Sequence, residues 1–191
     1  MRELKLNDME EEKRNEMTER TLEIALEAAR KYNVKHIVFA SKYGDSAEMV
    51  LNLRNNGIHF VCVRTAFGTY KQGENAMRDN IVERIKDSDI DLVTGTHVLS
   101  GAERGLSKKF NGIYPVEIIA NTLRMFGQGV KVCVEISSMA LDSGVIPYGE
   151  PIIALAGTAQ GLNTAILITP SYTANILDTK IHHIIIKEDI E

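Results

Sequence analysis

Short apolar runs alternate with helical patterns along most of this chain, and this alternation limits its fold more than any other feature. Residues 36–40, HIVFA, form a short run with β-branched and aromatic members, which is typical of a buried parallel strand. The pattern before that run places Leu22, Ala25 and Ala29 on one face of a helix. Strands that alternate with helices form a parallel sheet covered by helices.

The same patterns predict the remaining elements. Helices are expected over 18–33, 45–56, 77–87, 101–110 and 115–126, and strands over 36–40, 59–64, 91–94, 131–136, 151–156, 164–168 and 181–186. Because the last three strands have little helix between them, that end of the sheet is expected to be antiparallel. The sequence therefore predicts a three-layer α/β/α domain with a mixed, mostly parallel sheet.

Length and charge narrow the functional classes. The 191 residues are expected to form a single domain, with residues 1–17 as a loosely ordered N-terminal extension. A net charge of −4, with no basic cluster among exposed aromatics, predicts no nucleic-acid partner. No apolar run approaches the ~20 residues that span a bilayer, so no membrane partner is expected. Since the N-terminus is charged and shows no signal peptide, a cytoplasmic location is expected.

The loop after the first strand has the residues of an anion site. Residues 41–44 turn the chain, and Asp45 with Glu48 three residues later forms a capping-box pattern at a helix start. Free N–H groups and the positive end of the helix dipole favour an anion there. The loop also supplies one charge and two hydroxyls, from Lys42, Ser41 and Ser46. A phosphate cradle and an ordinary capped turn both remain open, and the carboxylate of Asp45 favours the second.

Cysteine and histidine spacing gives no redox pair and no metal site. Cys62 and Cys133 lie in apolar runs that are predicted to be strands, so two buried thiols are expected. If strand 36–40 separates these runs, the cysteines are roughly 9–10 Å apart, beyond the ~7 Å that a disulfide permits. His182 and His183 are neighbours on a predicted strand and point to opposite faces.

Five motifs carry a family resemblance. They are YGDSA at 43–47, HVLSG at 97–101, KVCVEI at 131–136, MALDSG at 139–144 and NTA at 163–165. Together they resemble the archaeal family of stand-alone relatives of the pyruvate kinase C-terminal α/β domain. The resemblance implies that fold and flavin mononucleotide (FMN) as the cofactor. In pyruvate kinase the equivalent domain holds a sugar-phosphate effector in the loop after its first strand. Residues 41–47 of this chain, which include Ala47, occupy the place of that loop. The chain departs from the family pattern at Met17, where asparagine is usual, and at Asn163, where aspartate is expected.

The strand order that the resemblance implies, 3-2-1-4-5, places a reversal between strands 36–40 and 131–136. Ligands of open parallel sheets bind outside the carboxyl ends of strands at such a reversal. The loops on that edge bring together Ser41, Lys42, Gly44, Asp45, Ser46, Thr65, Gly68, His97, Ser100, Glu135 and Met139. A phosphate fits the first loop, and a flat apolar ring fits beside Met139. The segment with Gly157 and Thr158 is either another wall of this site or only a hairpin turn.

Two of these residues have two interpretations each. Glu135 lies in a run that is predicted to be a buried strand, and a buried carboxylate needs partners. It either recognises a ligand or transfers a proton, or it accepts hydrogen bonds from neighbouring loop N–H groups. His97 follows a predicted strand and is either structural or, with a carboxylate nearby, a general acid or base.

A protein that binds a phosphorylated ligand is the favoured function, with FMN as the most specific candidate. The alternatives are a non-catalytic sensor of a phosphorylated metabolite and an enzyme that acts on a phosphorylated small molecule through His97 and Glu135. Pyruvate kinase activity is not expected, because the barrel and lid domains that the family uses for catalysis do not fit in 191 residues. The nucleotide motifs GxxxxGK[ST] and GxGxxG are absent as well. The sequence leaves open whether the protein catalyses any reaction. It also leaves open the oligomeric state, for which a homo-oligomer is one alternative.

Overall fold

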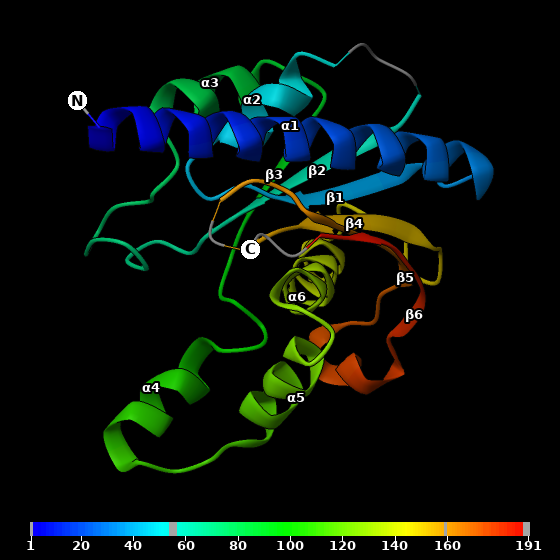
Figure 1. The fold of residues 1–191 in the computed structure, drawn as a ribbon. Coiled ribbons are helices and arrows are strands. Elements are labelled where there is room, and N and C mark those ends of the chain that lie inside the picture. Colours follow the sequence, from blue (N-terminus) through cyan, green and yellow to red (C-terminus); the bar gives the residue numbers. More distant parts are fainter. Residues whose placement is uncertain (1, 54–56, 159, 189–191) are drawn as a thin grey trace.

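A six-stranded sheet covered by helices on both faces forms the body of the molecule (Figure 1). The computed structural model describes residues 2–53, 57–158 and 160–188, and side chains from residue 10 onward. The helices are α1 (Arg2–Lys31), α2 (Asp45–Leu51), α3 (Asp79–Lys86), α4 (Gly101–Phe110), α5 (Pro115–Arg124), α6 (Gln128–Asp142) and the 3-10 helix η1 (Thr173–Asp178). The strands are β1 (His36–Ala40), β2 (His59–Arg64), β3 (Asp91–Thr94), β4 (Ile152–Ala156), β5 (Thr164–Thr169) and β6 (Lys180–Lys187).

The sheet order is β3-β2-β1-β4-β5-β6. The pairs β3–β2, β2–β1 and β1–β4 are parallel, whereas β4–β5 and β5–β6 are antiparallel. The predicted three-layer α/β/α domain with a mixed, mostly parallel sheet is therefore confirmed.

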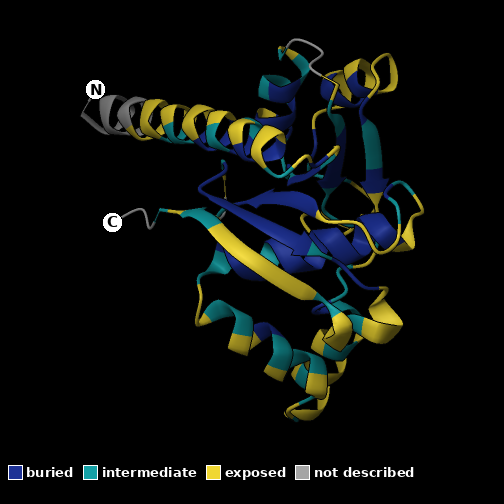
Figure 2. Cartoon of the chain, turned by 90° about the vertical axis from the view of Figure 1, so that its right-hand side faces the viewer, coloured by how far each residue is buried: buried dark blue, intermediate teal, exposed yellow. Residues whose placement is uncertain are grey.

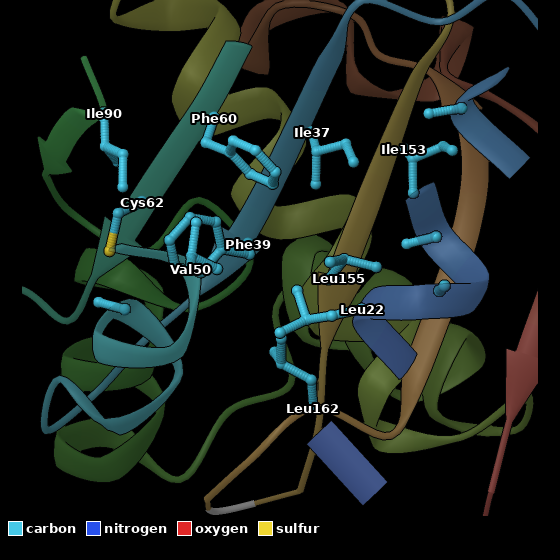
Figure 3. Close-up of a cluster of buried hydrophobic side chains, with 14 of the residues drawn as sticks. Leu22, Ile37, Phe39, Val50, Phe60, Cys62, Ile90, Ile153, Leu155 and Leu162 are labelled. Atoms are coloured by element: carbon cyan, nitrogen blue, oxygen red, sulfur yellow. The ribbon is translucent and has the colours of Figure 1, made fainter. Parts of the chain in front are cut away.

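Alternate residues of each strand enter two separate cores. Ile37 and Phe39 of β1 pack with α1, α2 and α3 on one face of the sheet (Figure 3). Val38 packs with α5 and α6 on the other face. Figure 2 shows the central strands and α6 as buried, whereas β6 lies exposed at the edge of the sheet.

The prediction of a strand over residues 131–136 is wrong, because this run lies inside α6. Twelve of the fifteen residues of α6 are buried. A helix that is buried on nearly every side shows no polar face, so its apolar run looks like that of a buried strand. The fourth parallel strand is instead β4, which lies beside β1.

Several predicted helices keep their type, but their observed ends differ from the predicted ones. The helix expected from residue 18 extends back to Arg2, so residues 2–17, expected as a loosely ordered extension, are helical. The helix predicted over 45–56 ends at Leu51, and residues 54–56 lie outside the described part of the chain. The strands at 36–40, 59–64 and 91–94 and the helix at 101–110 begin and end as predicted.

The two cysteines are free and buried, as predicted, but not for the predicted reason. Cys62 packs in the core beneath α1–α3, and Cys133 of α6 packs in the core on the opposite face. The sheet itself separates them. Burial raises the pKa of the Cys62 thiol to about 12 and raises the pKa of the Cys133 thiol as well.

We therefore expect a thiol reagent at neutral pH to react with neither cysteine in the folded protein, since the thiolate is the reactive form. Titration after unfolding without reductant should find both thiols. A native disulfide would contradict the placement of the two side chains in separate cores.

Candidate functional site

A cleft of about 280 Å³ opens at the carboxyl edge of the sheet. The residues that follow β1, β2 and β4 line it, together with residues of the loop after β3. The strand order reverses between β1 and β4, the position at which parallel sheets bind ligands. The structure brings these loops together at one edge, but the reversal does not involve residues 131–136, which belong to α6.

Most of the predicted site residues come together around this cleft. Its walls include Ser41, Lys42, Asp45, Ser46, Thr65, His97, Ser100, Glu135, Met139 and Gly157. Gly44, Ala47, Gly68 and Thr158 are not among the lining residues. Gly44 precedes α2 with φ at 105°, and a Cβ there would lie 3.0 Å from Ile81 Cγ1, so it shapes the turn.

The capping box predicted at the start of α2 does not form. Gly44 stands at the N-cap of α2, and Asp45 instead pairs with Arg78 at 3.1 Å. At the start of α4, Ser100 makes no side-chain capping bond, and Glu103 Oε2 accepts the Val116 N–H at 2.9 Å. The pair with Arg78 offsets the Asp45 charge, which therefore opposes an anion in the cleft less than the sequence suggested.

The first loop is held in place by its own serine. Ser41 Oγ accepts the Ala47 N–H at 3.2 Å, and the Ser41 N–H donates to the Val63 carbonyl at 3.0 Å. Lys42 Nζ lies 4.6 Å from the centre of the Tyr43 ring. These contacts fix the loop between β1 and α2 along the wall of the cleft.

Cations outnumber carboxylates around the cleft. The five basic side chains in its walls are Lys42, Arg64, Arg104, Arg124 and Lys131. The two carboxylates in its walls are Asp45 and Glu135, and each pairs with a cation. The cleft is therefore suited to an anionic ligand.

Sequence reasoning missed four of these cations. Arg64 is the last residue of a predicted strand, so its position at the strand end was a usable signal. Arg104, Arg124 and Lys131 come from α4, α5 and α6, and only the packing of those helices brings them to the cleft.

A buried ion pair lies in the wall that α6 forms. Lys131 Nζ is 2.6 Å from Glu135 Oε2, and the two side chains are 5% and 6% exposed. Glu135 Oε1 accepts the Leu99 N–H at 3.0 Å. Glu135 thus accepts a hydrogen bond from the loop after β3, as its structural interpretation required, while it also lines the cleft.

His97 also lines the cleft, in the loop after β3. Burial lowers its pKa, and Lys131 and Arg104 lower it further, whereas Glu135 acts in the opposite direction. The imidazole is therefore neutral at pH 7 and has one donor and one acceptor nitrogen.

Thr65 contributes a polar atom without a partner. Its Oγ1 is buried and makes no hydrogen bond within the described part of the chain, although its carbonyl accepts from Asn75 Nδ2 at 2.6 Å. Buried hydroxyls almost always have partners. Thr65 itself lines the cleft, so this unpartnered atom lies beside it.

The turn between β4 and β5 forms both a wall and a hairpin connection. Gly157 and Gly161 line the cleft, and a Cβ on Gly157 would lie 2.4 Å from the Gly161 carbonyl oxygen. Two hydroxyls of α1 fix the end of this turn. Thr18 Oγ1 accepts the Leu162 N–H at 3.0 Å, and Thr21 Oγ1 donates to the Leu162 carbonyl at 3.1 Å.

A second groove continues from the cleft. It has a volume of about 390 Å³ and lies between α1 and α2. The two cavities share Asp45, Ser46, Gln160 and Gly161. A ligand in the cleft therefore has room to extend toward α1.

In the described part of the chain, no group of three or more histidine, cysteine or acidic side chains could hold a metal ion. No helix in the same part of the chain is long and apolar enough to cross a membrane.

Comparison with known proteins agrees with this fold. Residues 19–168 match the family described as the pyruvate kinase alpha/beta domain. The chain belongs to this family. The match includes the loops after β1, β2, β3 and β4.

Among solved structures, the chain is similar to pyruvate kinases of Cryptosporidium parvum. One is 15% identical with a TM-score of 0.36, over 75% of this chain and 21% of that chain. Another, in complex with ADP, is 16% identical with a TM-score of 0.36 and the same two shares. The chain thus spans about a fifth of these pyruvate kinases.

Proposed function

We propose that this protein binds a phosphorylated small molecule in the cleft, with FMN as the most specific candidate. The surplus of positive charge around the cleft is the observation that carries this proposal. A phosphate carries up to two negative charges at neutral pH, and charge-assisted hydrogen bonds to cations are among the strongest in proteins. Ser41, Lys42 and Ser46 would hold the phosphate beside the first loop.

The rest of the cleft fits a flat ring. Its apolar surface comes from Val63, Val132, Ile136 and Met139. Thr65 lines the cleft, and its Oγ1, which has no partner in the described part of the chain, would reach a polar ring edge after rotation of its side chain. Flavin, when bound, supplies hydride and electron transfer. The protein's own part would be to bind, orient and shield the ring.

The size of the cleft is consistent with such a ligand. Its volume of about 280 Å³ is just below the roughly 300–1,000 Å³ that ligand pockets span. The adjoining groove extends that space. The same proposal includes a cytoplasmic location and no nucleic-acid partner, and the net charge of −4 supports the second of these.

Ser46→Glu should test the phosphate site. The new carboxylate would repel the ligand phosphate, so we expect FMN affinity to fall by more than tenfold, or ~1.4 kcal/mol. Quenching of FMN fluorescence measures the affinity. Ser143→Glu adds the same charge at an exposed position after the last residue of α6 and outside the cleft walls, and it should leave the affinity unchanged.

Equal affinities of both variants and the parent chain would remove residues 41–46 from the proposal. The colour of the purified protein separates the candidate ligands. A yellow protein supports FMN, whereas a colourless protein that sugar phosphates stabilise against heat supports a non-catalytic sensor of a phosphorylated metabolite.

A further inference from the structure

The buried pair of Lys131 and Glu135 has no role in simple phosphate binding. Its two charges are removed from water, with side chains 5% and 6% exposed. Buried ion pairs seldom stabilise a fold more than apolar side chains of similar volume would. A pair of this kind in the wall of a ligand cleft is therefore a candidate for chemistry.

The surroundings of Lys131 make its ammonium group a stronger acid than that of an exposed lysine, because its pKa is lowered. Burial lowers its pKa and Glu135 raises it, while Arg124 and Arg104 lower it. Within the described residues, Glu135 is the one group bonded to Nζ. A buried lysine with a lowered pKa is a nucleophile toward carbonyl groups.

We propose that Lys131 forms an imine with a phosphorylated aldehyde or ketone bound in the cleft. This inference rests on the proposed phosphate binding. The first loop, with Lys42 as its cation, holds the phosphate, and the carbonyl group lies toward α6. Lys131 is thus the residue that distinguishes a phosphorylated carbonyl compound from other phosphate esters.

The step balances without an oxidant or reductant. The amine nitrogen of Lys131 attacks the carbonyl carbon, and Glu135 carries one proton from that nitrogen to the carbonyl oxygen, which gives the neutral carbinolamine. Glu135 then carries the second nitrogen proton to the carbinolamine hydroxyl, which leaves as water when the C=N bond forms. The 2.6 Å separation of Nζ and Oε2 makes this proton exchange direct.

Comparison with two other lysines shows why a carbonyl compound would react selectively with Lys131. Lys71 pairs with Glu74 at the same 2.6 Å, but the two side chains are 65% and 55% exposed and neither residue lines the cleft. Lys42 lines the same cleft, but its Nζ lies over the Tyr43 ring, and no carboxylate among the described residues pairs with it.

The test uses pyridoxal 5′-phosphate as the probe, followed by borohydride to reduce any imine to a stable amine. We expect mass spectrometry of the digested protein to place the label on Lys131, and inorganic phosphate should protect this site. Lys131→Arg keeps a cation beside Glu135 and should lose the label, whereas Lys71→Arg should be labelled like the parent chain. Label on Lys42, or label spread over surface lysines as in the unfolded chain, would overturn the inference.

A second probe separates the two proposals. Pyridoxine 5′-phosphate has the same phosphate but no carbonyl group, and its competition with FMN is measured by fluorescence. If it competes while pyridoxal 5′-phosphate leaves Lys131 unlabelled in the parent chain, the imine is overturned and phosphate binding stands. If pyridoxal without phosphate labels Lys131 equally well, phosphate recognition is overturned.

Discussion

Replacing Glu135 with glutamine is expected to lower the free energy of unfolding by about 3 kcal/mol at neutral pH. The carboxylate accepts two hydrogen bonds, from the Leu99 N–H and from Lys131 Nζ. Each charge-assisted hydrogen bond contributes ~1.5–3 kcal/mol, and breaking a buried ion pair costs ~3–5 kcal/mol. For a chain of this length each kcal/mol corresponds to roughly 2–4 °C in melting temperature, which calorimetry resolves.

The pH dependence of the Glu135→Gln variant should identify Lys131 as the source of the loss. Burial already lowers the pKa of Lys131, and removal of Glu135 removes the group that raises it. Between the folded pKa and ~10.4, the unfolded chain then binds more protons than the folded chain, so stability rises with pH. The deficit of the variant should therefore be greatest below the folded pKa and should shrink toward pH 10.

Glu103→Gln provides the matched control. Glu103 also accepts one backbone N–H, that of Val116 at 2.9 Å, but it is only half-buried and no cation pairs with it among the described residues. We expect a much smaller change in melting temperature. If Glu135→Gln costs no more stability than this control but alters FMN affinity, ligand recognition is the main role of Glu135.

The sheet could be predicted from the sequence because its strands have clear local signals. The runs at 36–40, 59–64 and 91–94 are short, rich in β-branched residues and bounded by turns, and each forms a strand as predicted. The run at 131–136 has the same local composition but lies in α6. What distinguishes it is burial on every side of a helix, which results from tertiary packing.

The cleft could be predicted only in part for a related reason. Ser41, Thr65 and Gly157 directly follow strands, so the topology of a parallel sheet places them at one edge. Arg104 and Arg124 reach the cleft from α4 and α5, and no local pattern indicates how these helices pack. Glu135 was included for a wrong reason, since it follows no strand, yet α6 carries it to the cleft.

The packing of α6 on the sheet leads to the second large effect, that of Gly129→Ala. A Cβ at Gly129 would lie 2.1 Å from Thr164 Oγ1 and 2.6 Å from Thr164 Cβ. Thr164 is the first residue of β5, so relief of the overlap requires α6 to move away from the sheet. Overpacking of this kind costs ~1–3 kcal/mol or more, whereas alanine gains only ~1 kcal/mol over glycine in a helix.

We expect the free energy of unfolding of Gly129→Ala to be about 2 kcal/mol lower than that of the parent chain in denaturant titrations. Gly105→Ala in α4 is the control, since nothing lies within 4 Å of a Cβ there, and it should be neutral or slightly stabilising. FMN affinity should fall in Gly129→Ala alone, because Lys131 and Glu135 move with α6. A Gly129→Ala variant as stable as Gly105→Ala would contradict the close approach of α6 to β5 on which the α6 wall of the cleft depends.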